Sequence, residues 1–137
     1  MDSSIFKAYD IRGKYPQEIN EKIVSEIIRR FFNSKFKIII GHDARLSSPS
    51  LYKAAIKQLK IQSAPSANWR RRTKLKIVPA GMTTAPMLYF LVNKLNADFG
   101  IMLTASHNPK EYNGLKIVGK NAVPISGKEI LRIMNKE

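Results

Sequence analysis

The 137-residue sequence contains no cysteine, which excludes disulfide bridges and thiolate metal sites. Acidic residues are scarce, 10 against 24 lysines and arginines, and they do not cluster in a cation-binding spacing. No apolar run approaches the length of a membrane-spanning helix, and the N-terminus lacks a secretion signal. We therefore expect a cytoplasmic chain without membrane association, whose own side chains do not suffice to hold a metal ion.

Positive charge is the compositional outlier, with a formal net charge of +14 at pH 7. Such an excess attracts anions, whether nucleic acids, sugar phosphates or anionic surfaces, and does not select among them. Apolar residues make up 44% of the chain, and the length suits one compact domain with a hydrophobic core. We expect residues 1–137 to form a single domain.

The apolar pattern alternates between strand-like runs and helix-like stripes. Short apolar runs predict strands within residues 5–13, 37–41, 75–78, 99–105 and 115–118. Helical stripes begin behind the capping candidates Asn20, Ser48 and Ser126, and a further stripe follows Thr84 or Ala85, where Pro86 starts a helix. This order, β-α-β-α-β-α-β-β-α, predicts an α/β fold: a three-layer α/β/α sandwich with a mixed, mostly parallel sheet and helices on both faces.

Three segments are predicted to be irregular. Asp10–Gly13 and Asn113–Gly114 have the composition of turns. Residues 61–76 contain Pro65 and the run Trp69-Arg70-Arg71-Arg72, which predicts an exposed, strongly basic loop.

Polar side chains follow three of the predicted strands and should meet at one rim of the sheet, where ligands bind in open α/β folds. They are Asp10 with Arg12, Asp43 with Arg45, and Ser106 with His107 and Asn108; Lys116 follows the Asn-Gly pair. A hydroxyl among arginines, a lysine and a histidine suits phosphate better than metal, because arginine forks and lysine charges bind phosphate oxygens.

Each of these residues also has a plainer interpretation. Ser106 would then be a turn residue and His107 a surface side chain. Asp43 and Arg45 would pair with each other and brace their loop, and Arg12 would close a turn. The basic run around Trp69 would be a solvated loop rather than a nucleic-acid site.

Five motifs nevertheless occur together in a familiar order. They are AYDIRG (Ala8–Gly13), GHDARLSS (Gly41–Ser48), GMTTAPMLYF (Gly81–Phe90), TASHNP (Thr104–Pro109) and EYNGLKIV (Glu111–Val118). Along nearly its whole length, the chain resembles the first domain of the α-D-phosphohexomutases, a family that includes phosphoglucomutase and phosphomannomutase.

The resemblance implies a mechanism and its residues. Family members move a phosphoryl group between positions 1 and 6 of a hexose through a bisphosphorylated intermediate. Ser106 matches the serine that carries the phosphoryl group, Lys116 the lysine that assists proton transfer or charge balance, and His107 a supporting neighbour. The match to Arg12 would bind the phosphate, and the grouping at the rim adds Asn108 and Arg45 as phosphate-binding candidates. A Mg²⁺ ion would bind Ser106 only through its phosphate, and three aspartates outside this chain would complete the site.

Family members have four domains, so the missing mutase domains, whether linked to this one or in another chain, are implied partners alongside a hexose phosphate or hexose bisphosphate. We expect little or no turnover by this domain alone, and an apolar surface that favours self-association. A non-catalytic basic module that binds nucleic acid or protein, and a remnant without function, stay open as alternatives. The basic segment 61–76 departs from the family pattern.

Overall fold

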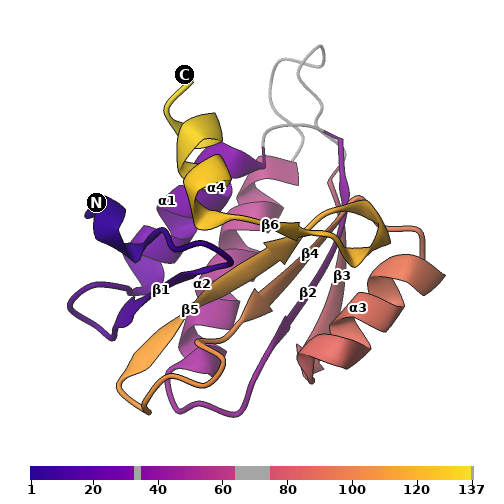
Figure 1. Ribbon diagram of the computed structural model, residues 1–137. Helices are drawn as coiled ribbons and strands as arrows, with labels where there is room; N and C mark the ends of the chain where they lie inside the picture. Colours follow the sequence, from indigo (N-terminus) through magenta and orange to yellow (C-terminus); the bar gives the residue numbers. More distant parts are fainter. Residues whose placement is uncertain (33–34, 64–74, 137) are drawn as a thin grey trace.

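The computed structural model describes residues 1–32, 35–63 and 75–136, which form one sheet flanked by helices (Figure 1). The strands are β1 (Ile11–Lys14), β2 (Lys37–His42), β3 (Lys76–Met82), β4 (Phe99–Leu103), β5 (Tyr112–Val118) and β6 (Pro124–Ile125). The α-helices are α1 (Glu21–Phe31), α2 (Ser48–Ser63), α3 (Ala85–Lys94) and α4 (Gly127–Met134). Two short 3-10 helices, η1 (Ser3–Ile5) and η3 (Lys120–Ala122), complete the described elements.

The sheet is mixed, as predicted. Its order is β1-β5-β4-β2-β3, with β6 beside β5. Strand β2 runs parallel to both β3 and β4, whereas β5 is antiparallel to its neighbours β4, β1 and β6. Among the described strands β5 therefore runs against the other five, and the sheet is mostly parallel in direction.

Helices cover both faces of the sheet, which confirms the three-layer α/β/α fold (Figure 1). Helices α1, α2 and α4 pack on one face over the larger apolar cluster, which includes Ile38 and Ile40 of β2. Helix α3 packs on the other face, over a smaller cluster that includes Ile39. Successive side chains of a strand point to opposite faces, so the unbroken apolar run in β2 is buried on both sides.

Two of the three predicted helix caps, Asn20 and Ser126, are confirmed, and of the two residues left open before Pro86 it is Thr84 that caps α3. The side chains of Asn20, Thr84 and Ser126 each accept the backbone N–H of the third residue that follows. The predicted cap at Ser48 is wrong, because α2 begins at Ser48 itself and the hydroxyl donates to Asp43. This hydroxyl belongs to the network described below.

Replacement of Ser126 by alanine removes the cap of α4 and leaves an N–H of its first turn without its side-chain acceptor. We expect Ser126→Ala to lower the free energy of unfolding by about 1 kcal/mol. Urea denaturation measures the change, and Ser126→Asp, which keeps an acceptor, should restore most of it. A Ser126→Ala chain as stable as the parent would contradict the cap.

Two predicted turns are strands instead. Asp10–Gly13 and Asn113–Gly114 fall largely within β1 and β5, where Arg12 lies opposite Gly114 and Gly13 opposite Asn113. Strand β5 begins at Tyr112, and its pairing with β1 overrides the local turn preference of the Asn-Gly pair. Strand β4 ends at Leu103 rather than at residue 105.

The predicted loop 61–76 is shorter at both ends. Residues 61–63 are the last turn of α2, and Lys76 is the first residue of β3. Residues 64–74, which include Trp69 and its three arginines, lie outside the described residues, so the nucleic-acid alternative gains no support. In the described part of the chain, none of the helices has the length and apolar content needed to cross a membrane.

Candidate functional site

A cavity of about 870 Å³ opens where β2, β3 and β4 end and α3 begins. Its lining includes Asp43 after β2, Met82 at the end of β3, Thr84 before α3, and Ser106 after β4. His107 and Lys116 also line it. The predicted rim at the carboxyl ends of the parallel strands is therefore a real concavity.

Ser106 has an unusual backbone and a free hydroxyl. Its φ of 56° lies in the left-handed region, which side chains other than glycine seldom adopt. Its N–H donates to the hydroxyl of Thr104 at 3.0 Å, and its carbonyl accepts from Arg45 at 2.7 Å. Within the described residues its Oγ has no hydrogen-bond partner, so this half-buried hydroxyl is available to a ligand.

Lys116 provides a positive charge on the same cavity wall. It pairs across the sheet with Met102. Its neighbours Leu115 and Ile117 point into the larger core, so Lys116 points to the α3 face. His107 is exposed beside Ser106. The N-terminus of α3, which is the positive end of the helix dipole, faces the same cavity. Lys116, His107 and this helix end together favour an anion there.

Arg12 lies on the same face of the sheet, but it does not line this cavity. It faces the α3 side because Ile11 belongs to the larger core. Its partner across the strands is Gly114, whose carbonyl accepts the N–H of Thr104. Arg12 is partly exposed and pairs with Asp10 at 3.5 Å.

Arg45 uses all five of its N–H donors within the protein. Nη1 donates to the carbonyls of Pro109 and Tyr112, at 2.8 and 3.1 Å. Nη2 donates to those of Ser106 and Asn108, at 2.7 and 2.8 Å, and Nε to Asp43 at 3.3 Å. The geometry favours the bracing role over direct phosphate contact, which stays a prediction.

The predicted phosphate ligand Asn108 is also engaged within its loop. Its side-chain amide donates to the carbonyl of Ala105 at 2.8 Å, and its backbone N–H donates to the same oxygen at 3.1 Å. These two bonds close the turn that follows Ser106. A phosphate contact by Asn108 stays a prediction.

Asp43 is the hub of this loop cluster. One carboxylate oxygen accepts from the Arg45 backbone N–H at 3.0 Å and from the Ser48 hydroxyl at 2.5 Å. The other accepts from Arg45 Nε at 3.3 Å and from the Thr104 hydroxyl at 2.6 Å. A carboxylate has about four acceptor positions, so Asp43 is fully satisfied inside the protein.

Sequence reasoning gave no role in the functional site to Thr104 or Asn113. Asn113 is fully buried, and its amide donates to Ser47 at 2.7 Å and to Ser48 at 2.9 Å, which extends the Asp43 network to β5. The sequence did hold a signal for both residues: Thr104 is a polar residue at the end of a buried strand, and Asn113 is one inside a strand. Buried polar groups need partners, and such positions bring distant loops together.

The described residues supply no Mg²⁺ site of their own, and the aspartates that the resemblance implies would lie outside this chain. The described residues contain no group of three or more His, Asp or Glu side chains able to hold a metal ion. Asp43, the one carboxylate that lines the cavity, has its acceptor positions filled. We therefore assign no step to a metal ion.

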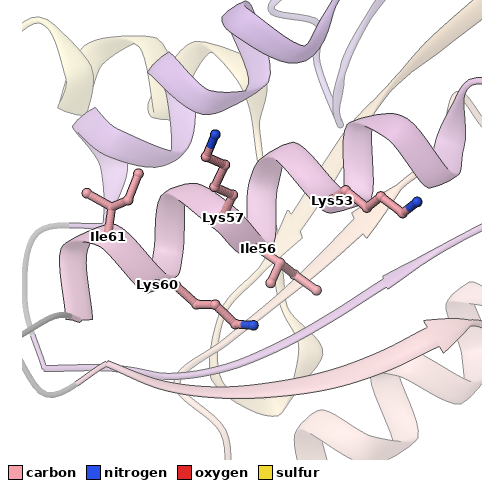
Figure 2. Close-up of a pocket in the computed structure, with 5 residues that line it drawn as sticks. All are labelled: Lys53, Ile56, Lys57, Lys60 and Ile61. Carbon is pink, nitrogen blue, oxygen red and sulfur yellow. The ribbon is translucent and has the colours of Figure 1, made fainter.

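A second hollow, of about 520 Å³, lies along α2 (Figure 2). It is lined by Lys53, Lys57, Lys60, Ile56 and Ile61. Figure 2 shows that the three lysine side chains diverge along the helix instead of converging on one point. This hollow therefore lacks the grouped chemistry found around Ser106.

Both the sequence and the fold are similar to those of known proteins. A family model described as phosphoglucomutase/phosphomannomutase, alpha/beta/alpha domain I, matches residues 3–137. A phosphomannomutase of Klebsiella pneumoniae is 40% identical over 129 residues, which cover 93% of this chain and 75% of that protein. A phosphomannomutase of Escherichia coli (strain K12) is also 40% identical over 129 residues, but they cover only 26% of its length.

Solved structures that resemble this fold belong to the same family. A phosphoglucomutase/phosphomannomutase family protein from Burkholderia thailandensis superposes with a TM-score of 0.77 at 29% identity, over 99% of this chain and 30% of that one. The chain therefore spans about a quarter to a third of the length of most of these relatives. The chain belongs to the phosphoglucomutase/phosphomannomutase family and matches its α/β/α domain I.

Proposed function

We propose that this chain is the phosphoryl-carrying domain of a phosphohexomutase, with Ser106 as the carrier. The observation that carries the proposal is the Ser106 hydroxyl, which has no partner within the described residues and lines a cavity with Lys116 and His107. The proposed substrates are hexose phosphates and their bisphosphates. The relatives' names point to this class, and a cytoplasmic location would suit it.

The proposed step is transfer of a phosphoryl group between the sugar and Ser106. Ser106 Oγ attacks the phosphorus of a hexose bisphosphate, the new Oγ–P bond forms, and the bond from phosphorus to the sugar oxygen breaks. The serine proton ends on that sugar oxygen, which leaves as a hydroxyl of the hexose monophosphate. The reverse step returns the phosphoryl group to the other position of the sugar.

Lys116 and His107 are the cationic or proton-carrying groups nearest to this step. Phosphoryl transfer depends chiefly on positioning and on stabilisation of charge on the transferring oxygens. Lys116 would bind a phosphate oxygen or carry the proton, and His107 would donate to the same group. Arg12 lies across the strands from Gly114, and it would bind the phosphate after giving up its ion pair with Asp10.

The described residues make only one side of a substrate site. They supply no metal-binding cluster, and relatives such as the Escherichia coli protein contain about four times the matched length. We propose that further domains, in the same or another polypeptide, bind the sugar, any Mg²⁺ and the second phosphate. The 137-residue chain alone should show little or no mutase turnover.

A test of the proposed carrier is uptake of phosphate by the chain itself. The protein is incubated with glucose 1,6-bisphosphate and Mg²⁺, and intact-mass spectrometry should show one phosphate-sized increment. Ser106→Ala should abolish the increment, because no other described hydroxyl in the cavity replaces its position. Peptide mapping locates the group. An increment that persists in Ser106→Ala would overturn Ser106 as the carrier, whereas no increment in the parent chain would mean that the transfer to Ser106, like turnover, needs the further domains.

A further inference from the structure

We propose that Thr104 and Asp43 are positioning residues, which hold the Ser106 backbone in its left-handed conformation through a directed hydrogen-bond relay. Neither residue would touch the phosphoryl group. The consequence for phosphoryl transfer rests on the proposed function of Ser106. The relay itself rests only on the contacts of the loop.

The direction of the relay follows from counting protons. A threonine hydroxyl has one proton, and Thr104 donates it to Asp43 at 2.6 Å. The Ser106 N–H then donates to the lone pairs of the same hydroxyl at 3.0 Å. Because an ionised carboxylate only accepts, Asp43 fixes the orientation of Thr104, and Thr104 fixes the N–H of Ser106.

Asp43 is confined to this supporting role, although it lines the same cavity as Ser106. Its four acceptor positions are occupied by Thr104, by Ser48 and twice by Arg45. It therefore has no free lone pair with which to remove the Ser106 proton. Its position beside the serine would otherwise suggest a general base.

The relay controls the backbone conformation of Ser106. A serine at φ 56° is held against its own preference, and such strain persists only where the surroundings impose it. Loss of the Thr104 hydroxyl would free the Ser106 N–H and let the backbone relax, which would move Oγ relative to Lys116. A displacement of about 1 Å can slow a reaction about 100-fold.

Thr104→Val tests the relay, because valine keeps the shape and removes the hydroxyl. Hydrogen exchange of the Ser106 amide, followed by NMR, should accelerate at least about tenfold, while amides of β2 and β4 exchange as before. In the phosphate-uptake assay the maximal rate should fall about 100-fold at an unchanged half-saturating bisphosphate concentration. Thr104→Ser, which keeps the hydroxyl, should restore both quantities.

Ser126→Ala is the matched control, since it removes a hydrogen bond at the start of α4. It should leave both the Ser106 exchange and the uptake rate unchanged, which separates the relay from a general loss of stability. Unaltered Ser106 exchange in Thr104→Val would overturn the relay, and altered exchange with a normal uptake rate would overturn its positioning role. A parent chain that takes up no phosphate would mean that the transfer needs the further domains, and the exchange measurement still decides the relay.

Discussion

Gly114→Ala should prevent β1 from pairing with β5 and should destabilise the chain by about 4 kcal/mol or more. A Cβ at this position would lie 1.9 Å from the carbonyl oxygen of Ile11 and 2.8 Å from the Cα of Arg12. Both atoms belong to the backbone of β1, so no side-chain rotation relieves the overlap. The strands must separate, and the buried side chain of Ile11 loses its packing.

Gly119→Ala is the matched control for this change. The nearest atoms to a Cβ at Gly119 lie 3.8 and 3.9 Å away, which is ordinary contact, so its effect should stay within about 0.5 kcal/mol. Urea denaturation of the two variants gives both values. A Gly114→Ala chain as stable as Gly119→Ala would contradict the β1–β5 pairing.

Gly114 also shows where sequence reasoning failed. An Asn-Gly pair is typical of a hairpin turn, and residues 113–114 were expected to form one. The structure places both inside β5, because pairing with β1 involves residues a hundred positions away. Local preference contains no information on such a distant partner. The turn predicted at Asp10–Gly13 was wrong for the same reason, because residues 11–13 pair with β5.

Elements set by local rules were predicted well. The cap at Asn20, the cap at Ser126 and the apolar run of β2 each depend on residues within a few positions, and all are confirmed. The meeting of Ser106, His107 and Lys116 at one cavity follows from sheet topology and from the family motifs. Whether these residues act on phosphate stays a prediction.

The network behind Ser106 was not predictable in the same way. Arg45 was a candidate phosphate ligand because it follows a strand that ends at the predicted rim, and a bracing role in its loop was the alternative. Only the structure shows that the guanidinium N–H groups of Arg45 donate to five oxygens, which belong to residues between 43 and 112. Buried networks depend on the saturation of every donor and acceptor, which a sequence does not record.

Arg45→Lys should therefore be far from conservative, with an expected loss of about 2 kcal/mol of stability. Lysine keeps the charge but has one compact ammonium with three donors, so it cannot reach the four loop carbonyls and Asp43 together. The pair is mostly buried, with side-chain exposures of 15% for Arg45 and 23% for Asp43, so water replaces the lost bonds poorly. Thermal or urea unfolding measures the change.

Arg132→Lys is the control for that substitution. Arg132 is 61% exposed and pairs with Glu129 at 3.9 Å, so its replacement should change stability by less than about 0.5 kcal/mol. If Arg45→Lys is equally mild, the five hydrogen bonds of the Arg45 guanidinium add no stability beyond that of a positive charge, and the bracing role is wrong.

Phosphate uptake separates the two roles of Arg45. A bracing arginine holds the carbonyls of Ser106 and Asn108, so its loss should slow uptake by about 100-fold at an unchanged half-saturating concentration of the bisphosphate. An arginine that binds the phosphate itself would instead raise that concentration, because its loss weakens substrate binding. Accelerated exchange of the Ser106 amide in Arg45→Lys should accompany the first outcome, since the loop conformation then depends on both the fork and the Thr104 hydroxyl.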